Sequence, residues 1–398
     1  MMSHSPLVPL NDLYLARCRR TRQAMVESNV PVMLILDSIN ILYITGASNM
    51  TFFSTRVPAR YLLIFAEGPT VLFEYFGCEH LAEGLPTIDR IQTARGLCYT
   101  SSGGRVSDSC KAFANEIRDI IKEHSGIENR LAVDRFPFVA IDALRASGLV
   151  LSDADIVLSS ARRTKLKSEV DYLKEALKRV EAATARFEEA IEPGKRESEI
   201  WAKFHEGLIG EGGQYVTTRL MQSGSNTYPY FKECSDRVLE PGDLVCLDTD
   251  ALGYQGYAVD YSRTFLCGER KATPVQHLLY ARAREQLEHN ASLIQSGASY
   301  QEIAERAWKV PEEHQDSRYY CIGHGLGMSG EYPNIPPAVD GETYPLSGVV
   351  EPGMVLCIES YIGSKNSGQG VKLEQQLLVT DTGTECMSNY KFDSRLGQ

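Results

Sequence analysis

The sequence predicts a mixed α/β (α+β) chain of two domains, the second of which carries acidic side chains at its strand ends. Three observations predict this. The length of 398 residues suits two domains. Strand-like and helical runs alternate through about the first 155 residues, and the C-terminal half contains an internal repeat. We expect an N-terminal α/β domain over residues 1–158 and a C-terminal catalytic domain over residues 159–398.

Composition restricts the class of partner. The chain is 43% apolar and 23% charged, with a net charge of -11, which argues against nucleic acid or an anionic membrane as its main partner. It has no apolar run of about 18 residues, and its start, Met1 to Leu15, lacks the order of a signal peptide. The ten cysteines form no CxxC pair, so we expect reduced thiols in a cytoplasmic protein.

Strand and helix signals alternate in the N-terminal part. Val32 to Leu36, Tyr61 to Phe65 and Thr70 to Phe73 are predicted strands, the last two joined by a turn at residues 67–69. Apolar residues recur at helical spacing from Lys111 to Lys122. This part contains no catalytic motif.

A pair of helices opens the C-terminal part. Ser168 is the expected N-cap of a long helix, whose apolar face continues to Phe187 before Pro193-Gly194 stops it. A second helix with apolar residues from Ile200 to Leu208 follows.

The repeat joins a turn, an apolar strand and a terminal carboxylate. Glu240-Pro241-Gly242 precedes the run that ends at Asp248, and Glu351-Pro352-Gly353 precedes the run that ends at Glu359. The second copy lies 111 residues after the first at both points. We therefore expect two pseudo-symmetric halves, each of which supplies carboxylates to one site.

The candidate metal ligands are five carboxylates and one imidazole. They are Asp248, Asp250, Asp260, His324, Glu359 and Glu374. Asp248 and Asp250 should share one face of a strand, because side chains two apart on a strand point the same way, and a hairpin should bring Asp260 opposite them. Glu359 and Glu374 can pair across a second hairpin in the same way.

Carboxylates so placed must be neutralised by protons or cations, because like charges cannot share a site that excludes water. Five carboxylates and one imidazole suit a pair of divalent metal ions. His324 lies between glycines that allow close approach of a ligand. The alternative is that Asp248-Thr249-Asp250 is a simple turn or a weak calcium loop, which leaves the apolar flanking runs unexplained.

These motifs resemble the pita-bread superfamily of methionine aminopeptidase, aminopeptidase P, prolidase and creatinase. The resemblance runs from about residue 160 to the end, and Asn40 to Gly46 is similar to the two-domain members. It implies a creatinase-like N-terminal domain and a C-terminal pita-bread domain with pseudo-two-fold halves. The acidic motifs Asp248 to Asp250 and Val371 to Glu374 and the glycines around His324 carry it.

The spacing of the aspartates resembles one branch, the dimethylsulfoniopropionate lyases of this fold. Asp260 follows Asp250 by ten residues and Asp248 by twelve, whereas the peptidases separate their two aspartates by eleven. The resemblance implies β-elimination from a small zwitterionic carboxylate, two divalent ions with iron favoured over manganese, cobalt or zinc, and a homodimer. The alternatives are an Xaa-Pro-type metallopeptidase and a non-catalytic binding module.

One position departs from both patterns. Gly330 stands where the peptidases carry a histidine and the lyases an aspartate as the proposed base. A hydroxide on the metals, a released Asp248 or Asp250, or Tyr319 could replace that base. The catalytic candidates are Asp248, Tyr319 and Glu331, the last of which belongs to the motif Glu331-Tyr332-Pro333 that resembles the lyases.

An aromatic segment is the candidate substrate-binding region. Tyr228, Tyr230 and Phe231 occupy the place where peptidases often have a substrate-site histidine. Aromatic faces attract sulfonium or quaternary ammonium groups, at ~0.5–2 kcal/mol each. The alternative for these residues is an ordinary aromatic core.

Overall fold

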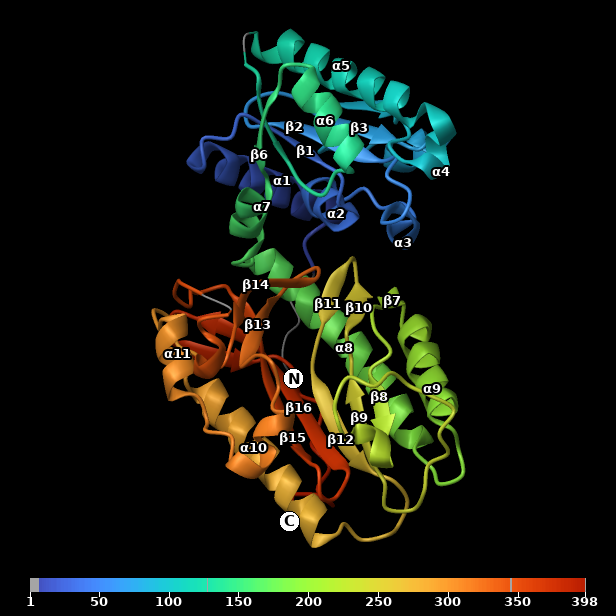
Figure 1. The fold of residues 1–398 in the computed structure, drawn as a ribbon, viewed down its shortest axis with the longest axis vertical. Coiled ribbons are helices and arrows are strands. Elements are labelled where there is room, and N and C mark those ends of the chain that lie inside the picture. Colours follow the sequence, from blue (N-terminus) through green and yellow to red (C-terminus); the bar gives the residue numbers. More distant parts are fainter. Residues whose placement is uncertain (1–6, 127, 344–345, 398) are drawn as a thin grey trace. The chain divides into compact units, whose positions relative to one another are not determined.

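The chain divides into two units, residues 1–162 and 163–398, each of which is described by itself (Figure 1). The structure is a computed structural model that describes residues 7–126, 128–343 and 346–397, so the first six residues of the start discussed above lie outside the described residues. Within these ranges no helix is both long enough and apolar enough to cross a bilayer.

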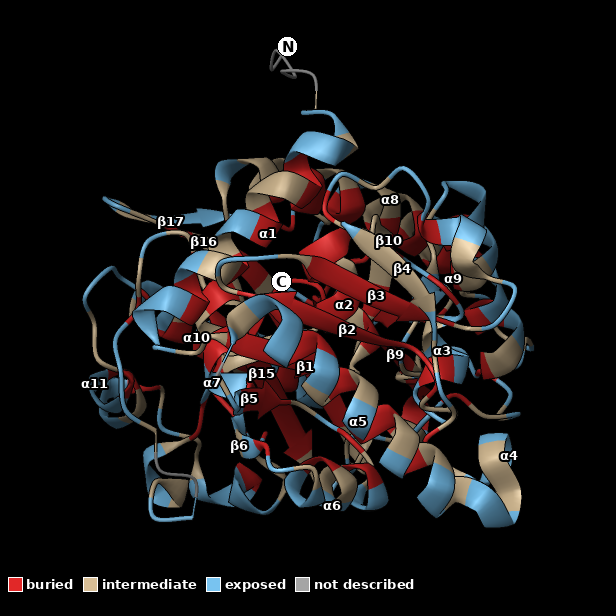
Figure 2. Ribbon diagram, turned by 90° about the horizontal axis from the view of Figure 1, so that it is seen from above, coloured by how far each residue is buried: buried red, intermediate tan, exposed pale blue. Residues whose placement is uncertain are grey.

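The first unit is built on a six-stranded sheet of order β4-β3-β2-β1-β5-β6. The strands are β1 (Val32–Ile35), β2 (Tyr61–Phe65), β3 (Thr70–Glu74), β4 (Arg90–Thr93), β5 (Arg130–Val133) and β6 (Val150–Asp153). β1, β2 and β3 pair antiparallel and are buried along their whole length (Figure 2). The three strands predicted in this part of the sequence are confirmed.

Helices cover this sheet. They are α1 (Leu10–Glu27), α2 (Ser38–Thr45), α3 (Thr51–Ser54), α4 (Tyr99–Ser102), α5 (Val106–Ser125), α6 (Phe138–Ala146) and α7 (Asp155–Arg162), with 3-10 turns η1 (Glu79–Ala82) and η2 (Gly103–Arg105). The predicted helix over 111–122 is confirmed and forms part of the longer α5. The apolar side of α5 packs on the sheet. The Phe113 ring packs edge-on against Tyr61, with 5.0 Å between the ring centroids.

The second unit begins with the two predicted helices, α8 (Lys167–Ala190) and α9 (Glu197–Gly210). The prediction of Ser168 as N-cap is wrong, because α8 already begins at Lys167. The Leu166 N–H at this end is satisfied by the Glu169 carboxylate, which accepts its hydrogen bond at 3.0 Å. The N-cap residue is therefore Leu166, and Glu169 in the first turn of the helix binds its backbone N–H.

The rest of the second unit consists of two groups of strands and their helices. The first group contains β7 (Tyr215–Val216), β8 (Met221–Ser223), β9 (Leu244–Asp248), β10 (Ala251–Tyr254), β11 (Tyr257–Val259) and β12 (Ser262–Leu266). The second contains β13 (Gly323–Leu326), β14 (Gly330–Ile335), β15 (Val355–Ser364), β16 (Gln369–Thr380) and β17 (Gly383–Cys386). Between and beside them lie α10 (Pro274–Ser292), α11 (Tyr300–Arg306), η3 (Gly224–Thr227), η4 (Glu312–Ser317) and η5 (Ala338–Asp340).

The internal repeat is visible in the backbone. Gly242 and Gly353 have nearly the same left-handed conformation, with φ of 89° and 88°, and each lies two residues before its strand, β9 or β15. In both halves a helix packs on the strands: α8 on β10 and β11, and α10 on β15 and β16 (Figure 1). The halves meet where the Thr264 hydroxyl of β12 donates to the Lys372 carbonyl of β16, at 2.8 Å.

The contact between α8 and β10 generates a stability prediction. A Cβ at Gly253 would lie 2.5 Å from the Ala176 carbonyl oxygen, which is a backbone atom that cannot turn away. We expect Gly253→Ala to lower the free energy of unfolding by ~1–3 kcal/mol, measured by urea denaturation. Gly330→Ala is the control, because a Cβ at Gly330 meets nothing within 4 Å. Equal stability of the two variants would contradict the packing described.

Candidate metal centre

Strand register brings the three aspartates together. Asp248 ends β9 and pairs with Ser262 of β12, while Ala251 pairs with Val259 in the neighbouring hairpin. The same register places Asp260 opposite Asp250, as predicted. Asp250 does not lie on the strand with Asp248 as predicted, because it follows the end of β9 in a left-handed conformation with φ of 37°. The carboxylates of Asp248 and Asp250 nevertheless point to the same place, as expected, with oxygens within 4.8 Å of each other.

The second half supplies the glutamates and the histidine. Glu359 of β15 pairs directly with Glu374 of β16, as the hairpin prediction required. His324 of β13 points its Nε2 toward three carboxylates, 3.6 Å from Asp260 Oδ2, 3.6 Å from Glu359 Oε1 and 3.8 Å from Glu374 Oε1. All six candidate ligands therefore lie in one cluster that joins the two halves.

Two groups within the cluster have the geometry to hold an ion. The His324 group comprises Asp260, His324, Cys357 and Glu374, and the Asp248 group comprises Asp248, Asp250 and Asp260; the ligand atoms of each group lie within 4.8 Å of one another. Asp260 belongs to both groups. Cys357 was not among the predicted ligands, and burial raises the pKa of its thiol well above the usual value, which disfavours the thiolate that binds metal.

Unpartnered oxygens show that the cluster suits a cation. Among the described residues, Asp260 Oδ1 and Glu374 Oε1 are buried and have no hydrogen-bond partner. A buried carboxylate oxygen without a partner is costly, and a divalent ion bound by carboxylates and imidazole would satisfy it. The residues present therefore fit divalent metal ions.

Burial and mutual repulsion oppose ionisation in part of the cluster. Burial, reinforced by the neighbouring carboxylates, raises the pKa of Asp260 and Glu374 well above the usual range. The same causes, burial first and then the charge of Asp248, raise the pKa of Asp250 to about 6. Without added positive charge these groups hold protons, which metal ions would displace.

Asp248 and His324 favour their charged forms. Burial would raise the pKa of Asp248, but the Lys372 ammonium and hydrogen bonds from Tyr230 and Ser262 outweigh it and lower the pKa to about 2. Burial would lower the pKa of His324, but hydrogen bonding and attraction to Glu359 raise it to about 9. Asp248 is therefore already neutralised by groups of the chain itself.

Lys372 is a functional residue that the sequence reasoning missed. Its fully buried ammonium lies 2.7 Å from Glu359 Oε2, 3.0 Å from Glu374 Oε2 and 3.3 Å from Asp248 Oδ2, and it donates to Ser262 Oγ at 2.7 Å. A signal was present, since Lys372 is two residues before Glu374 on one strand and must share its face.

The aromatic segment adjoins the carboxylates. The Tyr230 hydroxyl donates to Asp248 Oδ2 at 2.5 Å, and its ring lies 4.6 Å from that of Phe231 and 5.6 Å from that of Tyr319. Phe231 is 52% exposed, whereas Tyr319 is buried. Tyr228 is half-buried, and its backbone carbonyl accepts a hydrogen bond from Lys232 at 2.9 Å.

Glu331, the third catalytic candidate, and Gly330, the position of the missing base, have surroundings of a different kind. The Glu331 carboxylate forms a buried ion pair with Lys165 at 2.7 Å and accepts the Met328 N–H at 3.1 Å. These contacts hold Glu331 in a structural ion pair and leave its oxygens engaged. Gly330 is exposed at the start of β14 and has room for a side chain.

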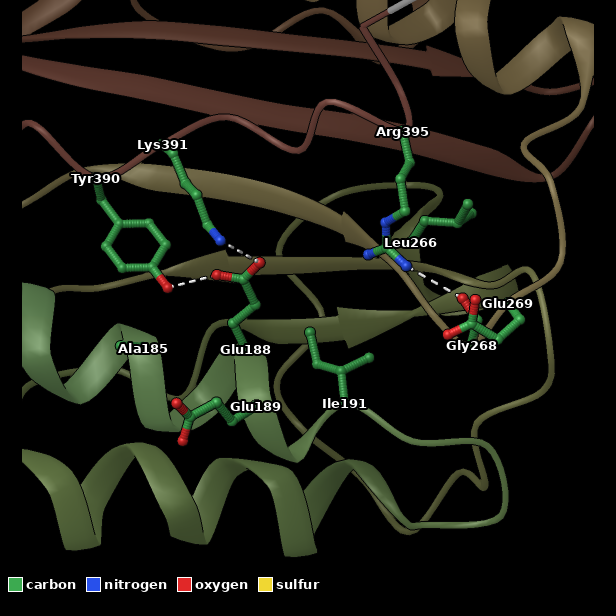
Figure 3. A pocket seen from close by; sticks show the side chains of 10 residues that line it. All are labelled: Ala185, Glu188, Glu189, Ile191, Leu266, Gly268, Glu269, Tyr390, Lys391 and Arg395. Atoms are coloured by element: carbon green, nitrogen blue, oxygen red, sulfur yellow. Dashed lines mark hydrogen bonds and ion pairs between the residues drawn. The ribbon is translucent and has the colours of Figure 1, made fainter.

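Pockets elsewhere in the second unit do not coincide with the cluster. A pocket of about 380 Å³ lies between α8 and the C-terminal segment, and none of the predicted site residues lines it (Figure 3). One of its carboxylates is engaged by neighbouring side chains, since Tyr390 and Lys391 both contact Glu188 (Figure 3). A smaller pocket, of about 110 Å³, does include Tyr319 in its wall.

Metal binding should release protons. At neutral pH the metal-free chain holds a proton on His324, whose pKa is about 9, and Asp250, with a pKa of about 6, is protonated below that value. Because coordination requires the deprotonated forms, we expect affinity for Mn²⁺ to rise as pH increases from about 6 to 9. Calorimetry in two buffers of different ionisation enthalpy measures the released protons.

His324→Ala is the matching variant for this experiment. It should weaken Mn²⁺ binding and reduce the proton release by the share that His324 contributes, while Asp260 and Glu374 still release protons. An affinity independent of pH over this range would contradict the assigned ligands.

Comparison with known proteins identifies the family. Residues 171–381 match the model of metallopeptidase family M24. The chain is 34% identical over 391 residues to the dimethylsulfoniopropionate lyase DddP of Roseovarius nubinhibens, covering 96% of this chain and 86% of that protein. It is 23% identical to an Xaa-Pro dipeptidase of Pyrococcus horikoshii, covering 94% of this chain and 97% of that protein.

The fold has close structural counterparts. The prolidase from Pyrococcus horikoshii OT3 superimposes with a TM-score of 0.76 at 22% identity, covering 95% of this chain and 99% of that chain. This likeness confirms the predicted two-domain pita-bread architecture. The chain therefore belongs to metallopeptidase family M24 and is an enzyme, either a lyase or a hydrolase.

Proposed function

We propose that this enzyme is a metal-dependent lyase that eliminates a β leaving group from a small zwitterionic carboxylate. Dimethylsulfoniopropionate, which would give dimethyl sulfide and acrylate, is the first candidate substrate. The likeness to a dimethylsulfoniopropionate lyase over 96% of the chain supports this proposal. So does the triple-aspartate spacing, which that branch shares.

The observation that carries the proposal is the junction of carboxylates and aromatic rings. Tyr230 links them, because its hydroxyl is bonded to Asp248 while its ring packs on Phe231. The open aromatic surface is that of Phe231 and Tyr320, which are 52% and 49% exposed. A substrate with a cationic sulfonium at one end and a carboxylate at the other suits such a junction.

The proposed metal ligands are the six residues of the cluster. They are Asp248, Asp250, Asp260, His324, Glu359 and Glu374. Two divalent ions bound there would hold the substrate carboxylate and withdraw charge from it, which acidifies the neighbouring C–H. Iron is favoured by the resemblance to the lyases, and manganese, cobalt and zinc suit the same ligand types.

Asp250 is the proton acceptor that the contacts favour. Asp248 accepts hydrogen bonds on both oxygens, from Ser262 and Tyr230, and its lowered pKa makes it a weak base. Burial and nearby carboxylates raise the pKa of Tyr319 far above its usual value, which opposes the phenolate. Asp250 accepts a side-chain hydrogen bond from Thr218, so when it is released from the metal ions its carboxylate is less engaged than that of Asp248.

The second candidate is Xaa-Pro-type peptide hydrolysis. The likeness to an Xaa-Pro dipeptidase and to a prolidase structure favours it. Gly330 counts against it, because the peptidases carry a histidine at this point of the motif. The exposed aromatic rings also suit a cationic group better than a peptide.

The deciding assay measures dimethyl sulfide in the headspace above iron- or manganese-loaded enzyme supplied with dimethylsulfoniopropionate. We expect gas from the wild type and none from chelated enzyme. Gly330→Asp is run in parallel, because the structure has room for that side chain. Gas from the variant alone would show that the wild type acts on another substrate. No gas from either, with hydrolysis of proline dipeptides, would establish the second candidate.

The aromatic contact predicts a change in substrate affinity. Phe231→Leu keeps an apolar side chain but removes the π face, so we expect KM for the sulfonium substrate to rise by about two- to tenfold with little change in kcat. Phe76→Leu is the control, since Phe76 is 89% exposed in the first unit. An unchanged KM for Phe231→Leu would exclude this ring from substrate binding.

A further inference from the structure

We propose that Glu197 is a positioning residue for substrate binding, because its carboxylate holds both ends of the loop that carries the aromatic rings. We name residues 223–235 the aromatic loop; it contains Tyr228, Tyr230 and Phe231. The inference rests on the proposed function, since it assigns the rings of this loop to the substrate. It concerns affinity for the substrate and leaves the metal ligands as they are.

Each oxygen of the Glu197 carboxylate binds one end of the aromatic loop. Oε1 accepts hydrogen bonds from the backbone N–H and the hydroxyl of Ser223, both at 2.7 Å, where the loop begins. Oε2 accepts from the backbone N–H and the hydroxyl of Ser235, at 2.8 Å and 2.5 Å, where the loop ends. Asn226 Nδ2 adds a bond to Oε1 at 3.2 Å. A single side chain therefore closes the loop at its base.

The surroundings of Glu197 leave the loop as its main partner. Glu197 is fully buried at the first position of α9, which packs beside β8 (Figure 1). It belongs to neither ion-binding group, and within the described ranges no lysine or arginine forms an ion pair with it. A buried carboxylate without a cation is costly, and the donors of the loop compensate for this. The helix dipole favours an acidic residue at this position but does not account for its contacts with both ends of one loop.

Other contacts support each end of the aromatic loop singly. Arg237 Nη1 donates to Ser223 Oγ at 2.9 Å, so the hydroxyl proton of Ser223 is left for Glu197. At the other end, the Cys234 N–H donates to the Arg219 carbonyl at 2.8 Å. Glu197 differs from these partners because it joins the two ends to each other.

The backbone of Phe231 shows why the ends must be held. Its φ of 72° is in the left-handed region, which is rare for a bulky residue and persists only where the surrounding structure fixes it. On one side of Phe231 the Tyr230 hydroxyl is bonded to Asp248, and on the other side Ser235 is bonded to Glu197. Loss of the second bond would let the backbone relax and move the exposed ring.

This arrangement has a consequence for substrate affinity. A loop that keeps its binding arrangement for only a tenth of the time binds its ligand about tenfold more weakly. The metal ligands lie outside the aromatic loop, so the reaction of bound substrate should change less than its binding. Glu197 therefore acts on KM through the positions of the rings.

Glu197→Gln tests this role, because it keeps the shape of the side chain but replaces one acceptor oxygen with an NH₂ donor that cannot hold a serine N–H or hydroxyl. In iron-loaded enzyme we expect KM for dimethylsulfoniopropionate to rise at least about tenfold, with kcat changed by less than about threefold. The affinity for Mn²⁺ should equal that of the wild type. Glu206→Gln, an exposed residue of the same helix, is the control and should match the wild type. An unchanged KM in Glu197→Gln would overturn the inference.

Ser235 provides a matched pair of variants that decides the inference even if Glu197→Gln fails to fold. Ser235→Ala removes the hydroxyl that donates to Glu197 and should raise KM by about two- to tenfold. Ser235→Thr keeps the hydroxyl at this half-buried position and should restore KM to near the wild-type value. Equal KM values for the two variants would overturn the inference, because a loss of stability alone does not distinguish them in this way.

Hydrogen exchange followed by mass spectrometry measures the loop without any substrate. We expect the amides of the aromatic loop to exchange at least about tenfold faster in Glu197→Gln than in the wild type or Glu206→Gln. Equal exchange in all three proteins would overturn the role of Glu197 in holding the loop. Absence of dimethyl sulfide from the wild type would overturn the proposed function and the assignment of the rings with it. Wild-type activity together with an unchanged KM in Glu197→Gln would overturn the inference alone.

Discussion

The repulsion between five carboxylates that share one small volume is the constraint on which the rest of the site depends. Four of them, Asp248, Asp260, Glu359 and Glu374, are buried, so water cannot screen their charges. Lys372 and His324 supply part of the compensation, and the two unpartnered oxygens mark where it is incomplete. The cluster therefore favours the binding of added cations.

The two halves of the second unit position these carboxylates with the same succession of elements. Each half provides a glycine turn, a buried strand and an antiparallel partner. Asp248 ends β9, whereas the strand expected to end at Glu359 continues to Ser364, so that Glu359 and Glu374 lie in the middle of their hairpin. Because ladder pairing fixes which residues lie opposite, Glu359 must meet Glu374, and Asp250 must meet Asp260. Residues that are ten to fifteen positions apart in the sequence therefore lie together in one cluster.

The aromatic rings connect the metal chemistry to the substrate. Tyr230 and Tyr319 face the chain's own ammonium group, while Phe231 remains open to the outside. The same physical property, attraction of a cation by a ring face, thus serves Lys372 within the protein and is proposed to serve the substrate at the surface. These two uses of aromatic rings explain why the segment from Tyr228 to Phe231, whose composition is that of an aromatic core, contains the exposed ring of Phe231.

The sequence by itself determined the class of fold, the repeat and the identity of the clustered acidic residues. It could do so because strand alternation, turn glycines and carboxylates at strand ends are local signals. It did not determine that Asp250 leaves the strand in a left-handed turn, that Leu166 and not Ser168 is the N-cap of α8, or that Glu331 pairs with Lys165. Only the tertiary structure decided these points. The alternation along β16 already places Lys372 on the face of Glu374, but its contacts with Asp248 and Ser262 are made between strands and leave no mark in the local pattern.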